Sequence, residues 1–286
     1  MKLKVLVLGS SGLIGSTTLR VLSERSDWQV YGSIRSDSIR PFLPKISEDK
    51  LISNLDVDNF SSIIQAVSEI RPDVVINCIG ATKHKKEGNS PLNAIELNAL
   101  LPHRIAQVCA LAGARFIHIS TDCVFSGRDG FYSESAFADA DDVYGRSKAL
   151  GEVIYGCALT LRTSTIGHEL QSSYGLLNWF LSQKSSCKGF NRAIFSGLPT
   201  VVFAQVIRDI VLKNTQLSGL YHVAAQPINK YDLLKMVAKV YKKEINIEAD
   251  DSLIINRSLD AGKFNQATGY NPPNWQNLIE TMYQFQ

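Results

Sequence analysis

Tyr144 and Lys148 are the residues whose types and spacing most directly suggest chemistry. The segment Tyr144-Gly-Arg-Ser-Lys148 places a phenol and an amine four residues apart, and on a helix such residues share one face. A nearby ammonium stabilises tyrosinate, so it is expected to lower the phenol pKa from its ordinary value of about 10. The pair therefore predicts a proton donor or acceptor that works near neutral pH. Taken by itself, the pair could instead be two side chains on an exposed helix face with no catalytic role.

A glycine-rich segment near the N-terminus predicts a dinucleotide-binding turn. Its Gly-x-x-Gly-x-x-Gly spacing differs by one residue from the Gly-x-Gly-x-x-Gly fingerprint, but it meets the same physical demand. The turn must let the backbone approach a pyrophosphate and aim a helix N-terminus at the negative charge. An ordinary glycine turn is the alternative, and placement at the first strand-helix junction favours the dinucleotide. The predicted contacts here are Gly9, Ser11, Gly12, Leu13, Ile14 and Gly15.

The residue after the second predicted strand bears on the choice of cofactor. NAD sites usually place Asp or Glu about 20 residues beyond the glycine turn to hold the ribose 2′-hydroxyl. Arg35 occupies that place, and a guanidinium there could pair with a 2′-phosphate. This favours NADP(H), with NAD(H) as the alternative cofactor and a solvated surface arginine as the alternative role. Asp56 and Val57 are expected to contact the adenine, although Asp56 would suit a turn equally well.

Two further loops follow predicted strands. Cys78, Ile79 and Gly80 come after the run at 74–76, and Ser120-Thr121 comes after the run at 115–119. In an open parallel sheet, ligands bind beyond the carboxyl ends of the strands, near the point where the strand order reverses. We therefore expect these loops to gather around the same crevice as the glycine turn.

The elements that must position these residues alternate between strand and helix. Apolar, β-branched runs predict strands at 4–8, 29–34, 51–52, 74–76, 115–119 and 158–161. Helical patterns lie between them at 13–24, from Asp58 past Val67, at 90–112 and at 142–154. This alternation predicts an α/β fold with a doubly wound parallel sheet, the Rossmann fold. We expect a dinucleotide-binding core over residues 1–163. A smaller, mixed lobe over 164–286 would mainly bind substrate and could return elements to the core.

Composition and charge exclude several classes of protein. The chain has 286 residues, of which 45% are hydrophobic and 20% are charged, a poor fit to disorder or a coiled coil. A net charge of +3 is too mild to indicate nucleic-acid binding. No apolar stretch approaches the roughly 18 residues of a membrane span, and five widely spaced cysteines suit neither a disulfide scaffold nor a metal site. We expect a cytoplasmic protein that binds neither membrane nor metal.

Together the motifs resemble those of the extended short-chain dehydrogenase/reductases, above all the dTDP-4-dehydrorhamnose reductase branch, which handles nucleotide sugars. The resemblance runs through nearly the whole chain. Besides the glycine turn, the matching pieces are Ser120-Thr-Asp-Cys-Val-Phe125, Asp142-Val-Tyr-Gly-Arg-Ser-Lys-Ala-Leu-Gly-Glu152, Leu161-Arg-Thr-Ser164, Gly197-Leu-Pro-Thr200, Gly219-Leu-Tyr-His222 and the tail from Arg257 to Trp275.

This resemblance implies roles for the matching residues. Thr121 would hydrogen-bond the substrate carbonyl, Tyr144 would be the acid, and Lys148 would hold the nicotinamide ribose and tune Tyr144. Tyr144 and Lys148 would thus also touch the cofactor. The positions expected to border the sugar or the nucleotide are Asp122, Cys123, Val124, Phe125, Arg162, Thr165, Ser196 and Thr200.

Two of these positions depart from the reductases that the chain resembles. Cys123 stands where they usually have tyrosine, and Thr165 stands where they usually have tryptophan. Both changes remove aromatic surface from the expected sugar pocket. The related sugar dehydratases carry glutamate at the position of Cys123 to eliminate water, which a cysteine cannot readily do, so dehydration is disfavoured.

The resulting hypothesis is NADPH-dependent reduction of the keto group of a nucleotide-activated 4-keto-6-deoxysugar, a step of polysaccharide biosynthesis, in a chain that could form a homodimer. An epimerase that retains its NAD is one alternative. A non-catalytic, NADP-binding regulatory subunit is another, which the intact Thr121, Tyr144 and Lys148 set argues against. Lys83-His-Lys-Lys86 could attract a substrate phosphate, but a solvated loop is the simpler interpretation.

Overall fold

The first strand shows why the central sheet is covered on both faces. In the computed structural model, which describes residues 2–43, 50–57, 59–82 and 90–286, β1 spans Leu3–Leu8. Its Val5 and Val7 pack into one hydrophobic core, and Leu6 and Leu8 pack into a second core on the opposite face. A strand buried on both sides must be apolar at nearly every position, as the sequence is here.

Parallel strands form the central sheet in the order β11-β6-β5-β4-β1-β2-β3. The order reverses between β1 and β4, the point at which such sheets bind ligands. The predicted doubly wound fold is thereby confirmed. The remaining strand bounds are β2 Trp28–Ser33, β3 Leu51–Ile52, β4 Val74–Asn77, β5 Arg115–Thr121, β6 Leu159–Thr163 and β11 Gly219–His222.

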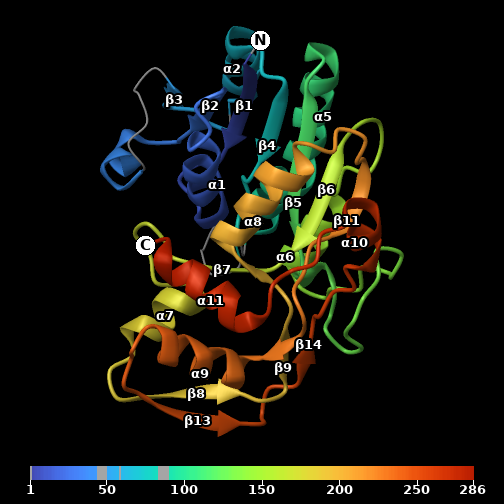
Figure 1. Cartoon of the computed structure of the whole chain (residues 1–286). Coiled ribbons are helices and arrows are strands. Elements are labelled where there is room, and N and C mark those ends of the chain that lie inside the picture. The colour runs from blue at the N-terminus through green and yellow to red at the C-terminus, as the bar shows by residue number, and fades with distance from the viewer. Residues whose placement is uncertain (1, 44–49, 58, 83–89) are drawn as a thin grey trace.

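Helices cover the two faces. One face packs against α1 (Leu13–Ser23) and α8 (Thr200–Val206), which lie side by side in front of the sheet in Figure 1. The opposite face packs against α2 (Phe60–Ile70) and α5 (Leu101–Ala112). The expected cap of α2 at Asp58 and the Lys83–Lys86 segment lie outside the described residues.

The predicted helix over 90–112 is interrupted. It consists of α4 (Pro91–Ala94), a π-helical turn η3 (Ile95–Leu100) and α5. Helix α6 (Val143–Leu150) is shorter than the predicted 142–154. The helix ends at Gly151, which packs closely on η3. A Cβ at this position would lie 1.8 Å from the Asn98 carbonyl oxygen, so only glycine fits. Insertions of π-helix are frequent at functional sites.

The chain after residue 163 builds the lower lobe of Figure 1 and also returns to the sheet. Strand β11 pairs with β6, so the C-terminal part supplies an edge of the central sheet. Two helices of this part are α7 (Leu176–Ser182) and α9 (Lys230–Val240). The other elements are η1 Asp37–Phe42, η4 Asp122–Val124, β7 Thr165–Ile166, β8 Ser186–Phe190, β9 Ala193–Phe195, β10 Leu198–Pro199, η5 Ile207–Val211, β12 Ile228–Asn229, β13 Asn246–Asp250, β14 Ile255–Asn256, α10 Gly262–Thr268 and α11 Trp275–Gln284.

Strands β7 to β14 and helix α10 were not predicted. All of these strands are two to five residues long, which is too short for a periodic pattern to stand out. Within the described ranges, no helix is both long enough and apolar enough to cross a membrane.

Candidate active site

The glycine turn after β1 is packed so closely that two of its glycines are required. Gly9 adopts a φ of 80°, which favours glycine, and its carbonyl accepts the Gly12 N–H at 3.0 Å. A Cβ at Gly15 would lie 2.1 Å from the Gly9 oxygen. The turn and the first helical residues therefore form one compact unit.

The N-terminus of α1 is suited to an anion. Gly12 is its N-cap, with no side-chain cap and no acidic residue in the first turn, so the first N–H groups remain available. Ser11 and Gly12 are exposed, while Leu13 and Ile14 are half-buried. The loop after β4 adjoins this turn, since a Cβ at Gly9 would meet the Ile79 backbone nitrogen at 3.0 Å. The predicted contacts thus converge in a place that fits a pyrophosphate.

The opposite end of the expected cofactor site lies beyond β2 and β3. Arg35 is exposed between β2 and η1 and makes no hydrogen bond or ion pair with another described residue. Arg40, on the same segment, is already held by Asp37 and by the Ser53 hydroxyl. Asp56, beyond β3, accepts the Ser62 hydroxyl through its carbonyl at 3.0 Å. Val57 packs on the core that faces α2.

The predicted reactive residues meet where β5 ends. Thr121 is the last residue of β5, and Tyr144 lies in the first turn of α6. The Thr121 hydroxyl lies close enough to the Tyr144 phenol to lower its pKa, and it donates to Asp122 Oδ1 at 3.1 Å. Gly145 explains the close approach of the helix, because a Cβ there would lie 2.2 Å from the Cys123 carbonyl oxygen.

The pKa of Tyr144 shifts in the direction opposite to the one predicted. Burial raises the pKa above its ordinary value, and the nearby Cys123 and Asp122 add to the rise, while the neighbouring Thr121 hydroxyl offsets only part of it. The prediction of a lowered pKa was therefore wrong for this arrangement. At neutral pH the phenol of Tyr144 therefore carries its proton.

Lys148 lies one helical turn from Tyr144, and the backbone of β5 holds its amine. Its Nζ donates to the Ile119 carbonyl at 2.9 Å and lies 3.5 Å from His118 Nε2. The side chain is nearly enclosed, and this burial lowers its pKa to about 8. Near neutral pH the amine is therefore charged but loses its proton far more readily than an ordinary lysine.

Asn98 is a site residue that sequence reasoning missed. It lies in the π-turn η3 and is fully buried. Its side chain accepts the Ala81 N–H at 2.9 Å, and its amide donates to the Ala81 carbonyl and to Ser147 Oγ, each at 3.1 Å. Asn98 thereby ties the loop after β4 to the helix that carries Tyr144 and Lys148. An asparagine within an apolar helical run is the signal that could have found it.

Arg257 is a second residue that was missed, and it comes from the C-terminal lobe. Its Nε donates to the Phe125 carbonyl at 2.8 Å, and its Nη1 lies 3.6 Å from Cys123 Sγ. Its charge also opposes the burial that raises the pKa of Asp122. Arg257 therefore holds the loop after Thr121 in place through its contacts with Cys123 and Phe125. No local pattern distinguishes this arginine from a surface one.

The predicted sugar-bordering residues separate into two groups, and the first consists of those in the loop after β5 and in β7. Asp122, Cys123 and Val124 form η4 directly after Thr121, and the fully buried Phe125 follows them. Thr165 is half-buried in β7, where it pairs with Leu198.

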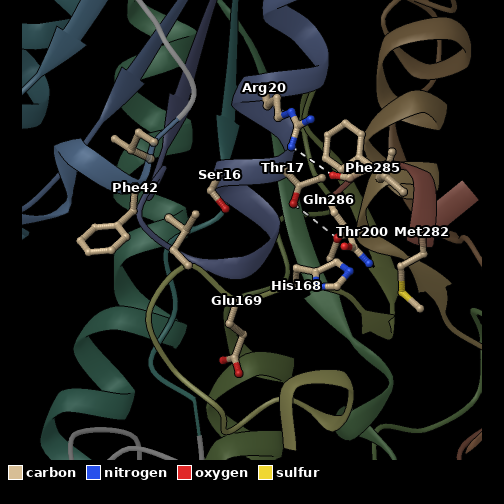
Figure 2. Close-up of a pocket in the computed structure, with 13 residues that line it drawn as sticks. Ser16, Thr17, Arg20, Phe42, His168, Glu169, Thr200, Met282, Phe285 and Gln286 are labelled. Atoms are coloured by element: carbon tan, nitrogen blue, oxygen red, sulfur yellow. Dashed lines mark hydrogen bonds between the residues drawn. The ribbon is translucent and has the colours of Figure 1, made fainter. Parts of the chain in front are cut away.

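The second group consists of residues whose side chains hydrogen-bond other residues of the chain. Arg162 is buried and makes two hydrogen bonds to Glu152, at 2.6 and 2.7 Å. Ser196 Oγ accepts the Leu259 N–H at 3.0 Å. Thr200 Oγ1 lies 3.4 Å from Thr17 Oγ1, a bond between α8 and α1 that Figure 2 shows.

Thr200 also lines a cavity of about 420 Å³ between α1, the loop after β7 and the C-terminal residues. Figure 2 shows Arg20 and Phe285 on one wall of this cavity and His168 and Glu169 on another. None of Thr121, Tyr144 and Lys148 belongs to its lining. Across the described part of the chain, no cluster of three His, Cys, Asp or Glu residues could hold a metal ion.

Comparisons with known proteins place these features in a wider context. Residues 2–285 match a family model described as the RmlD substrate binding domain. A probable low-salt glycan biosynthesis reductase of Haloferax volcanii is 29% identical over 231 residues, 77% of this chain and 74% of that protein. A dTDP-4-dehydrorhamnose reductase of Aggregatibacter actinomycetemcomitans is 23% identical over 304 residues, 98% of each chain. In fold, the chain is similar to the dTDP-4-dehydrorhamnose reductase of Bacillus anthracis in complex with NADP, with a TM-score of 0.82, 20% identity and full coverage of both chains.

Proposed function

The chain belongs to the RmlD substrate binding domain family, as its motifs predicted, and we propose that it is an NAD(P)-dependent oxidoreductase acting on nucleotide sugars. Its reaction is the reduction of the keto group of a nucleotide-activated 4-keto-6-deoxysugar. The observation that carries the proposal is the meeting of Thr121 with the protonated phenol of Tyr144, one helical turn from Lys148. Relatives whose names describe reductases of this kind support it.

The residues of the chain divide the work of the reaction. Bound NADPH supplies the hydride that reduces the carbonyl carbon. Tyr144 donates its proton to the carbonyl oxygen, which becomes the alcohol, and Thr121 hydrogen-bonds that oxygen so that it faces the phenol. Lys148 offers a positive charge one turn away, which stabilises the phenolate left behind. The glycine turn and the N-terminus of α1 hold the pyrophosphate of the cofactor.

A panel of substrates tests the proposal directly. The protein and NADPH are incubated with dTDP-, UDP- and GDP-linked 4-keto-6-deoxysugars, and the loss of NADPH absorbance is followed while products are identified. We expect stoichiometric NADPH consumption and a hydroxyl group in place of the ketone with at least one sugar. Epimerised sugar without net NADPH loss would instead favour the epimerase. No turnover of any sugar, despite NADPH binding, would favour the regulatory subunit.

Arg35 is the residue proposed to select NADPH over NADH. Replacing it with serine removes a charge-assisted contact to the 2′-phosphate, and we expect about tenfold weaker NADPH binding, or roughly 1.4 kcal/mol. NADH affinity should not change, because NADH has no 2′-phosphate. Both dissociation constants are measured by fluorescence titration. Arg40→Ser is the matched control, since Arg40 is engaged by Asp37 and Ser53, and equal losses in both variants would contradict the assignment.

We also propose that the chain forms a homodimer through α4, η3 and the end of α6. Large apolar side chains are exposed there, including Leu92, Leu150 and Ile154 at 73%, 68% and 58%. His103, in α5, ties this helical segment to the end of α6, because its ring contacts the Leu150 carbonyl and the Tyr155 hydroxyl, each at 2.8 Å. Leu150→Glu should convert a dimer into monomer in sedimentation velocity. The equivalent change at Leu253, exposed in the C-terminal lobe, should not.

A further inference from the structure

Behind the reactive residues lies a chain of buried polar groups that the proposed reaction does not use. Asn77 ends β4, His118 lies beside it in β5, and both are fully buried. Asn77 Nδ2 is 3.2 Å from His118 Nδ1, and His118 Nε2 is 3.5 Å from Lys148 Nζ. Strand pairing fixes the first contact, since Asn77 and His118 are register partners. The imidazole is therefore held between the sheet and the amine of Lys148.

The hydrogen bonds determine which nitrogen of His118 carries its proton. Asn77 Oδ1 already accepts the Ile79 N–H at 3.1 Å, which turns the amide nitrogen of Asn77 toward the ring. An amide nitrogen only donates, so His118 Nδ1 must accept. Burial and the charge of Lys148 hold the pKa of His118 well below its ordinary value, so the ring is neutral. Its one N–H proton then lies on Nε2 and faces Lys148.

We propose that Asn77 and His118 are positioning residues for Lys148, and that the N–H they present to the amine sets how readily Lys148 gives up its proton. An N–H beside an ammonium is unfavourable, whereas beside a neutral amine it has a lone pair to bind. With its tautomer locked by Asn77, His118 cannot turn an acceptor toward Lys148 unless the Ile79 bond is broken. The pair thus favours the neutral amine.

Other groups around Lys148 act on it as well. The Ile119 carbonyl accepts from Nζ, and Glu152, beyond the end of α6, favours the charged amine. Cys78, in the loop after β4, faces the same space, and burial raises its pKa to about 12, so it is a neutral thiol. His118 differs from these neighbours because a substitution can replace the hydrogen-bond donor that faces the amine with an acceptor, without changing the charge of the side chain.

The test follows Lys148 itself in the cofactor-free protein. Lysine labelled with ¹³C at Cε is titrated by NMR, and the Lys148 signal is identified by its loss in Lys148→Met. In His118→Gln the glutamine oxygen can accept from the ammonium, so we expect the midpoint to rise by about one pH unit, a tenfold gain in proton affinity. His168→Gln is the matched control. His168 is a part-buried histidine bonded to Tyr241, and its substitution should leave the midpoint unchanged.

A second variant keeps the test decisive if His118→Gln does not fold. Asn77→Asp offers only acceptors to His118 Nδ1, which moves the ring proton there and turns Nε2 into an acceptor for Lys148. It should also raise the midpoint, and much of that rise should vanish in a His118→Phe background, where no ring nitrogen remains to relay the change. A midpoint that stays at the wild-type value in the folded variants overturns the proposal.

The kinetic consequence rests on the proposed reductase function and is measured separately. If Lys148 must be charged during turnover, the alkaline limb of the pH–rate profile should move upward in His118→Gln together with the NMR midpoint. A limb that stays in place while the midpoint moves would contradict the role of Lys148 in the reaction but not its control by His118. The two inferences can therefore fail independently.

Discussion

Replacing Tyr144 with phenylalanine is expected to lower kcat about 10²- to 10⁴-fold, the usual contribution of a positioned general acid. The aromatic ring and its packing remain, so NADPH should bind as tightly as it does to the wild type. The loss arises because the carbonyl oxygen no longer receives a proton as the hydride arrives. Turnover is measured by NADPH absorbance with the best sugar of the panel, and cofactor affinity by fluorescence titration.

Tyr174→Phe is the matched control for this change, since Tyr174 is an exposed tyrosine outside the site. It should retain wild-type turnover. If Tyr144→Phe also stays within a few-fold of wild type, then Tyr144 is not the general acid, however close it lies to Thr121. Loss of both turnover and NADPH affinity would indicate a collapsed site instead of a missing proton.

Replacing Arg162 with methionine is expected to lower the free energy of unfolding by about 3–5 kcal/mol, as for other broken buried ion pairs. The side chains of Arg162 and Glu152 are only 5% and 8% exposed. Arg162 also contacts His222 Nε2 at 3.2 Å and stacks over Phe125. Its removal leaves the Glu152 carboxylate buried without the guanidinium, while the Ser120 hydroxyl still donates to it at 2.6 Å. Urea unfolding followed by circular dichroism measures the loss.

Two further variants show whether the loss comes from the unpaired carboxylate. The double replacement Arg162→Met with Glu152→Met removes both charges, so it should recover much of the stability. Arg25→Met breaks an exposed ion pair with Asp27 and should leave the urea midpoint near that of the wild type. If Arg162 instead bound the nucleotide, its replacement would raise the KM for the sugar substrate without a comparable loss of stability.

The reactive pair illustrates what local sequence can and cannot establish. The four-residue spacing of Tyr144 and Lys148 was sufficient to place them one helical turn apart. The direction of the Tyr144 pKa shift was not readable, because it depends on how far α6 sinks against the loop after β5. The glycine at position 145 permits that depth, because a Cβ there would lie 2.2 Å from the carbonyl oxygen of Cys123.

Arginine provides a second comparison. Arg35 and Arg162 both occupy positions that suggest a ligand, yet Arg35 is exposed and Arg162 is enclosed by Glu152, His222 and Phe125. Arg257 had no assigned role and lies directly against Cys123 and the Phe125 carbonyl. The partners of a long side chain depend on segments brought in from elsewhere, and no spacing rule anticipates them.

By itself, the sequence determined the parallel α/β sheet and the family to which the chain belongs, and it predicted the glycine turn and the Thr121–Tyr144–Lys148 set as the site. The sheet, the glycine turn and the spacing of Tyr144 and Lys148 are encoded by residues close together in the chain, through hydrophobic period, backbone freedom and helical spacing. Only the tertiary structure showed that β11 joins the sheet and that Asn98 and Arg257 support the site. It also showed that burial raises the pKa of Tyr144 and lowers the pKa of Lys148. Burial and partner choice depend on contacts between distant segments, and such contacts exist only once the chain has folded.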